Sequence, residues 1–89
     1  MYAVLVKVRF KSGRHDDAMR MLQAQVVPDV KGASGFVRGT WFGNDATGHS
    51  VVLFDTEEQA SRTTQEVGST PAEGVRVVSS DVYELHAQA

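Results

Sequence analysis

The stretch Tyr2-Ala3-Val4-Leu5-Val6-Lys7-Val8-Arg9-Phe10 opens this chain of 89 residues with an apolar or aromatic side chain at every even position. β-branched and aromatic residues dominate it, and a period of two is typical of a β-strand whose two faces meet different surroundings. Ser12 and Gly13 interrupt the pattern. The sequence therefore predicts a strand over residues 2–10.

The residues that follow this strand have the periodicity of a helix. Asp16 and Asp17 suit a first turn, where carboxylates complement the helix dipole. An apolar stripe continues at spacings of three and four residues, through Ala18, Met21, Leu22, Val26 and Val30. Because Pro28 has no backbone N–H and crowds the carbonyl of Ala24, we expect this helix to end near Val27 or to kink there.

The remainder of the chain predicts a hairpin, a second helix and a last strand. Residues 36–42 and 49–54 resemble two strands, and the Gly- and Asn-containing connector 43–48 is typical of a hairpin. Thr56-Glu57-Glu58-Gln59 matches a capping box, so a helix is expected from Glu57 to about Val67. We expect a loop over 68–74, then a strand over 75–78 that changes phase around Ser79 and Ser80 and resumes over 82–86.

This order, β-α-β-β-α-β, is that of the ferredoxin-like α+β fold, in which two helices cover one face of a four-stranded antiparallel sheet. The chain has no room for a second core, so residues 1–89 are expected to form a single domain. No internal repeat or linker interrupts the pattern.

Composition excludes several classes of function. The absence of Cys excludes disulfides, thiolate zinc sites and iron–sulfur clusters, and the three scattered His residues do not predict a metal site. A net charge of −2 argues against nucleic-acid partners, and no apolar run approaches the roughly 18 residues of a membrane span. We expect a cytoplasmic protein without cofactor. The lack of Ile and the excess of Arg over Lys are typical of a bacterial origin.

Both faces of the predicted sheet are apolar, although two helices can cover only one. Ala3 and Leu5 alternate with the even-numbered valines of the first strand, and Val51 and Leu53 alternate with Val52 and Phe54. In the second strand, strict alternation assigns Val37 and Trp41 to one face and Phe36 and Phe42 to the other. Soluble monomers seldom expose so large an apolar patch, so we expect a homodimer that packs through the open sheet face.

The strand order, the Ser12-Gly13 start of the first helix, the Val27-Pro28 and Gly35-Phe36 passages and the segment Val52–Ala60 together resemble the dimeric α+β barrel superfamily. Within it, the resemblance is to the antibiotic-biosynthesis-monooxygenase-like group. It implies a barrel shared by two subunits, with the C-terminal strand often contacting the partner. It also implies a small apolar pocket between sheet and helices in each subunit.

That resemblance implies two kinds of chemistry, and the residues favour one of them. Haem-degrading members use an Asn, a Trp and a His. Here Asn44 is the only Asn and lies in the hairpin connector, Trp41 is the only Trp, and the predicted second helix contains neither Trp nor His. Haem degradation is therefore disfavoured. Cofactor-independent oxidation of a phenolic or polyketide-type molecule needs chiefly an apolar cavity and a few hydrogen-bond donors.

The candidate site residues are aromatic and polar side chains placed on the predicted strands. His86 is the candidate proton acceptor, if the last strand reaches a pocket of the partner. The candidate substrate-binding residues are Tyr2, Arg38, Trp41, Phe54 and Tyr83. Each has a structural alternative, since Trp41 and Phe54 also suit a core or an interface and His86 a solvated terminus.

Two functions are consistent with these residues. The first is a monooxygenase-like protein that oxidises a small aromatic or polyketide-type substrate in an apolar pocket. The alternative is a catalytically silent dimer that binds a small ligand or another protein, and the lack of catalytic side chains on the second helix favours it. An RNA-recognition domain shares the strand order, but the third strand lacks the aromatic and basic residues that such a domain requires.

Overall fold

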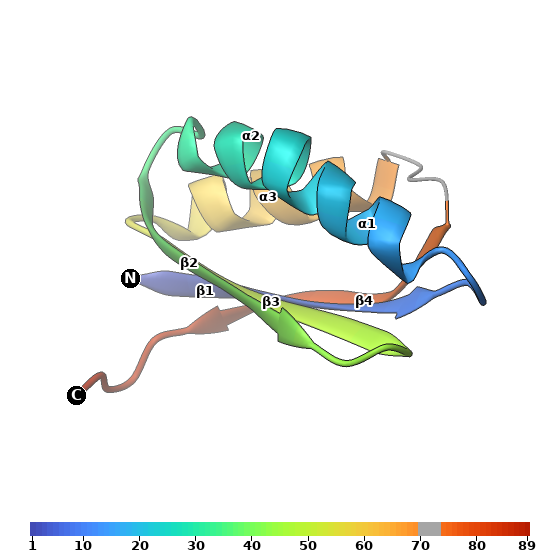
Figure 1. The fold of residues 1–89 in the computed structure, drawn as a ribbon. Helices are drawn as coiled ribbons and strands as arrows, with labels where there is room; N and C mark the ends of the chain where they lie inside the picture. Colours follow the sequence, from blue (N-terminus) through green and yellow to red (C-terminus); the bar gives the residue numbers. More distant parts are fainter. Residues whose placement is uncertain (70–73) are drawn as a thin grey trace.

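The computed structural model describes residues 1–69 and 74–89. Its chain order is β1 (Tyr2–Phe10), α1 (His15–Met21), a π-helical turn η1 (Leu22–Val26), α2 (Val27–Lys31), β2 (Phe36–Gly43), β3 (Thr47–Phe54), α3 (Glu57–Ser69) and β4 (Val75–Glu84). The strands form one antiparallel sheet in the order β2-β3-β1-β4. Figure 1 shows all the helices above one face of this sheet, while the other face is open. The predicted ferredoxin-like α+β fold is confirmed.

Of the two expected outcomes at Pro28, an end near Val27 or a kink, the end is wrong, because the helical segment continues past Pro28. The segments α1, η1 and α2 follow one another without a break from His15 to Lys31. In η1 the hydrogen bonds run from residue i+5 to residue i, and the N–H of Val27 donates to the carbonyl of Leu22. The wider turn brings Pro28 into the first turn of α2, where a missing N–H costs little.

The second helix begins as the sequence predicts. The backbone N–H of Thr56 donates to Oε1 of Gln59, and the N–H of Gln59 donates to Oγ1 of Thr56, both at 3.2 Å. These reciprocal bonds form a capping box, which satisfies two backbone donors at the start of α3. The helix extends to Ser69, beyond the predicted end at Val67. Residues 70–73 of the expected loop lie outside the described residues.

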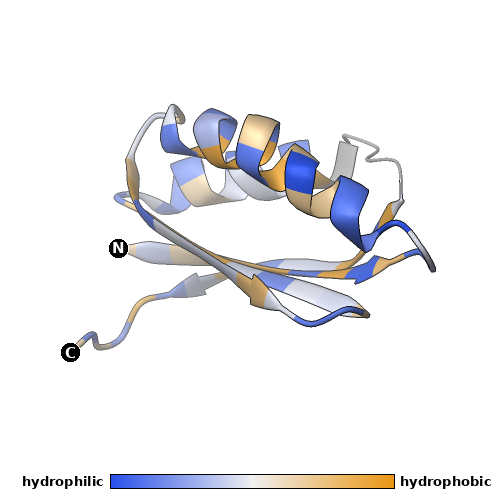
Figure 2. Ribbon diagram, in the orientation of Figure 1, coloured by the Kyte–Doolittle hydropathy of each residue, from blue (hydrophilic) through white to orange (hydrophobic). Residues whose placement is uncertain are grey.

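The core lies between the helices and the sheet. Its fully buried members are Val4, Val52, Phe54 and Ala60, with Val6 nearly buried beside them. Val4 pairs with Val52 on one side and with Val82 on the other, so one row of side chains crosses three strands. Figure 2 shows hydrophilic and hydrophobic residues alternating along the helical layer, as expected where one helix face packs on a core.

Two irregularities change which side chains share a sheet face. The register between β2 and β3 shifts between Phe36 and Arg38, so Phe36 packs against the core together with Trp41. The strict alternation expected for this strand, with Phe36 and Trp41 on opposite faces, is therefore wrong. The second shift, between β1 and β4, occurs where Ser79 and Val77 pair with consecutive residues of β1. This bulge confirms the predicted phase change in the last strand.

The open face of the sheet carries apolar side chains at the surface. Leu5 and Tyr83 are exposed there, Tyr83 by more than half of its surface. Charged residues of the same strands, such as Arg38 and Asp81, are exposed as well. Within the described ranges, no helix has both the length and the hydropathy that crossing a membrane requires.

Candidate functional site

A cavity of about 740 Å³ lies between the sheet and the helical layer. Its sheet side consists of residues of all four strands, including Val6, Trp41, Val52 and Val77. Its helix side comes from α1, η1, α2 and α3, with Met19, Leu22 and several further apolar side chains. A cavity of this size, walled mainly by apolar groups, suits a small organic molecule.

Trp41 and Gly39 shape one part of the sheet side. They lie two residues apart on β2 and so face the same way. A Cβ added at Gly39 would lie 2.6 Å from Cη2 of Trp41, which shows that the indole lies against the backbone of Gly39. Glycine at position 39 therefore gives the only Trp of the chain room to lie along the strand.

Phe10 and Gly48 form a similar pair nearer the hairpin. A Cβ at Gly48 would lie 2.8 Å from Cζ of Phe10, so the phenyl ring lies across the backbone of β3. The imidazole of His15 meets this ring edge-on, with centroids 5.1 Å apart. His15 is half-buried and lines the cavity, and histidine is the side chain that exchanges a proton most readily near neutral pH.

The hairpin between β2 and β3 forms part of the cavity wall. The side chain of Asn44 accepts hydrogen bonds from the backbone N–H groups of Ala46 and Thr47 at 2.9 and 2.8 Å. This arrangement fixes the turn between β2 and β3. His49, at the start of β3, stacks on Phe42 with centroids 5.3 Å apart and rings 15° from parallel. Asn44 and His49 both contribute to the cavity wall.

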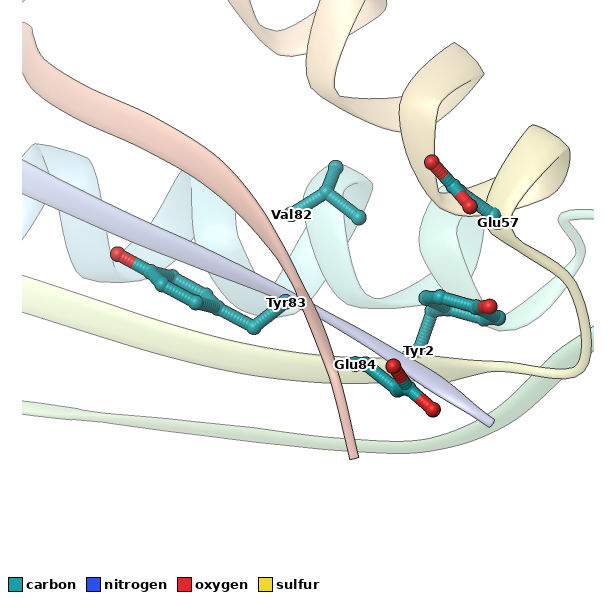
Figure 3. Close-up of a pocket in the computed structure, with 5 residues that line it drawn as sticks. All are labelled: Tyr2, Glu57, Val82, Tyr83 and Glu84. Carbon is teal, nitrogen blue, oxygen red and sulfur yellow. The ribbon is translucent and has the colours of Figure 1, made fainter. Parts of the chain in front are cut away.

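A second, smaller pocket of about 260 Å³ lies at the opposite end of β1 and β4. Its lining residues are Tyr2, Glu57, Val82, Tyr83 and Glu84. Figure 3 shows Tyr2 beneath Glu57 at the start of α3, while the ring of Tyr83 points away from both. The pocket is thus a polar surface hollow with two carboxylates, and it is separate in composition from the large cavity.

The residues selected from the sequence do not form one site within a single subunit. Trp41 lines the large cavity, whereas Tyr2 and Tyr83 line the small pocket. Phe54 is completely buried in the core. Arg38 is exposed, at a position whose neighbour on β3 is Leu53.

His86 lies beyond the end of β4 and is exposed. Figure 1 shows the C-terminal segment leaving the body of the fold on the side away from the helices. His86 is not among the described residues that line either pocket. Only contact with another subunit would give this residue a role in a cavity.

Sequence reasoning missed Phe10, His15 and Ser50 as cavity residues. Phe10 and Ser50 are at even positions of their strands, as are the core valines, so strand phase alone could have placed both on the inner face. His15 could not be found this way, because its position depends on how the start of α1 lies against Phe10. Among the described residues no group of three His, Asp or Glu side chains is arranged to hold a metal.

No known protein family matches the sequence, and no curated protein does. Solved structures with the same fold were found at low sequence identity. HapK from Hahella chejuensis has a TM-score of 0.71 and 12% identity over 100% of this chain and 96% of its own. A protein of unknown function from Nitrosomonas europaea, NE2512, has a TM-score of 0.63 and 18% identity. The match covers 99% of this chain and 91% of NE2512.

A third similar structure is a monooxygenase from the gene ActVA-Orf6 of Streptomyces coelicolor in complex with nanaomycin D. Its TM-score is 0.61 and its identity 9%, over 99% of this chain and 89% of that one. At such identities the likeness concerns the fold. The chain therefore shares the fold of HapK, NE2512 and this monooxygenase, a four-stranded antiparallel sheet covered on one face by helices.

Proposed function

We propose that this protein oxidises a small aromatic or polyketide-type molecule with molecular oxygen, without a cofactor, in the cavity between sheet and helices. The observation that carries this proposal is the cavity itself, about 740 Å³ in volume and lined by Trp41, Phe10 and many aliphatic side chains. An apolar, aromatic-lined cavity excludes water from a reactive anion and holds a flat ring by stacking. The monooxygenase with the same fold supports this reaction class.

The proposed reaction balances without a cofactor. A base removes a proton from an activated CH₂ group, the resulting carbanion transfers electrons to O₂, and the peroxide formed loses water. The balance is R₂CH₂ + O₂ → R₂C=O + H₂O. The protein must then supply a proton acceptor and an apolar surface that binds the ring.

Within one subunit, His15 is the candidate proton acceptor, because it lines the cavity and contacts Phe10. His86 retains the role proposed from the sequence if the terminal segment of a second copy reaches this cavity. Histidine can act as a general base near neutral pH in either case.

We further propose that two copies pack through their open sheet faces. Leu5 and Tyr83 are exposed on this face, and exposed apolar side chains of this kind favour association. A twofold axis would place the same patch of each copy against the other. Such a dimer would cover Tyr83, Arg38 and the start of the C-terminal segment.

The alternative, a catalytically silent ligand-binding dimer, is favoured by one specific observation. Nδ1 of His15 lies 3.8 Å from Oδ1 of Asp16, which is too far for the hydrogen bond that commonly orients a catalytic histidine. A protein with the cavity but without an oriented base would bind the aromatic ligand and leave it unchanged.

Oxygen uptake with 9-anthrone, which has a CH₂ group between two aromatic rings, tests the proposed activity. We expect anthraquinone and one O₂ consumed per product. His15→Gln should lower kcat by about 100-fold or more if this residue is the base, and His86→Gln if the partner supplies it. Trp41→Ala should weaken substrate binding, whereas Tyr83→Ala, which removes an exposed aromatic ring from the small pocket, should not.

Binding of anthrone without oxygen uptake would exclude the oxidation and leave the silent binder. Neither binding nor uptake over a panel of anthrones and hydroquinones would exclude both functions.

A further inference from the structure

Ser50 is a polar residue in the middle of the inner face of the sheet. It lies on β3, directly between Trp41 of β2 and Val6 of β1 in the strand register. Only 9% of its surface is exposed, and it lines the large cavity. Within the described part of the chain, no hydrogen bond of its hydroxyl to another group is found, and its oxygen is not one of the fully enclosed polar atoms without a partner.

Burying a serine at this position is less favourable for folding than burying its apolar neighbours on the same strand. Adjacent positions on this face hold Val52 and Phe54, which contribute to the core. A hydroxyl among apolar neighbours is unfavourable unless water or a ligand in the cavity forms a hydrogen bond with it. The hydroxyl of Ser50 is therefore available to a molecule in the cavity, as donor or as acceptor.

Two aromatic rings lie on either side of Ser50 along the β2–β3 ladder. On one side the indole of Trp41 lies against Gly39, which pairs with Val52. On the other side the ring of Phe10 lies across Gly48. A flat ligand that stacks on either ring would bring an atom at its edge close to Ser50.

The charges around the cavity restrict the ligand further. Three carboxylate residues line it, Asp29, Asp45 and Glu66, together with the two histidines His15 and His49. Among the described residues that line it there is no Lys and no Arg. A ligand carrying a carboxylate would meet groups of like charge, and no Lys or Arg among the described lining residues would attract it, whereas a neutral ligand would not be repelled.

We propose that Ser50 is the hydrogen-bonding anchor of a ligand site that selects neutral aromatic molecules bearing a hydroxyl or carbonyl oxygen, and that disfavours anionic ones. This inference rests on the proposed use of the cavity for small aromatic molecules. It adds two details to that function. The Ser50 hydroxyl orients the bound ring, and the ligand is neutral.

A titration with three probes of the same ring system tests both parts. The probes are 2-naphthol, which is neutral at pH 7, 2-naphthoate, which is anionic, and naphthalene, which has no polar group. The indole N–H of Trp41 is the only one in the chain, so its NMR resonance reports occupancy of this cavity. We expect 2-naphthol to bind most tightly and 2-naphthoate at least 10-fold more weakly.

Ser50→Ala should lower the affinity for 2-naphthol by about 3- to 10-fold, as expected for one net hydrogen bond, and leave the affinity for naphthalene unchanged. Ser79→Ala, the same change at an exposed position of β4, should leave all three affinities unchanged. Unchanged naphthalene binding also shows that the Ser50 variant is folded.

The outcomes separate this inference from the proposed function. If naphthalene and 2-naphthol bind equally well and Ser50→Ala changes neither, the role of Ser50 is wrong although the cavity still takes aromatic ligands. Binding of 2-naphthoate as tight as that of 2-naphthol overturns the charge selectivity. If none of the probes shifts the Trp41 resonance, both the inference and the proposed function fail.

Discussion

At the scale of single residues, Phe54 and Trp41 are both aromatic residues on strands, but they have different roles. Phe54 is completely buried in the core, and Trp41 lines the cavity. Phe54→Ala should lower the free energy of unfolding by about 3–5 kcal/mol, since it removes a fully buried ring. Urea unfolding followed by Trp41 fluorescence measures this loss.

The matched control for Phe54 is Phe42, more than half of whose surface is exposed. Phe42→Ala should cost much less stability under conditions that keep the protein monomeric. Equal losses for the two variants would contradict the assignment of Phe54 to the core.

Gly39 is a second residue whose role can be tested alone. A methyl group at this position would lie 2.6 Å from the indole of Trp41, so the ring must move towards the cavity. Gly39→Ala should reduce stability by about 1–3 kcal/mol and weaken binding of 2-naphthol. Gly32→Ala is the control, because its nearest neighbours would be 3.5 Å away, and it should bind 2-naphthol as the wild type does. Normal binding by Gly39→Ala would contradict this position of the indole.

Residue type and strand phase predicted part of the candidate site. Trp41 could be selected because a lone Trp on an amphipathic strand is a frequent ligand contact or core residue. The sequence could not separate it from Phe54, since both residues fit an inward position and only the packing of α3 and the core decides which one reaches the cavity. Arg38 and Tyr83 depend on what covers the open face, which is a property of the assembly.

At the scale of elements, the start of α3 offers a direct test. Thr56 and Gln59 exchange two hydrogen bonds there. Thr56→Ala should lower the free energy of unfolding by about 1 kcal/mol, because it leaves a backbone N–H of the first turn without its partner. Thr56→Ser retains the oxygen and should stay close to the wild type in thermal unfolding. A similar loss in both variants would show that the cap contributes little.

Elements with a strong local signal were predictable, and those shaped by tertiary packing were not. The alternation of residues 2–10 and the capping box at Thr56 predicted β1 and the start of α3. The continuation of the helix through Pro28 depends on the π-helical turn η1, which has no comparable sequence signal. The register shift after Phe36 likewise depends on how β2 pairs with β3.

At the scale of the whole molecule, the helices cover one face of the sheet and leave the other exposed. If two copies pack through this face, sedimentation equilibrium at micromolar concentration should give twice the chain mass of 9.7 kDa. Leu5→Glu places a charge on this face and should shift the protein to the monomer mass. Ala24→Glu, at an exposed position of the helical layer, should not.

A wild-type protein that sediments as a 9.7 kDa particle would contradict the dimer. The order of strands and helices along the chain could be predicted from the sequence because each element has its own pattern. The cavity could not, since its volume depends on how far the helical layer lies from the sheet.

The claim on which the proposed function depends is that a small aromatic molecule binds between the sheet and the helices. Intermolecular NOEs between 2-naphthol and assigned methyl groups test it, because neighbouring strand residues report opposite faces. We predict NOEs to Val6, Val52 and the Trp41 ring, which line the cavity. NOEs confined to Leu5, Val51 and Tyr83 on the open face would contradict the claim.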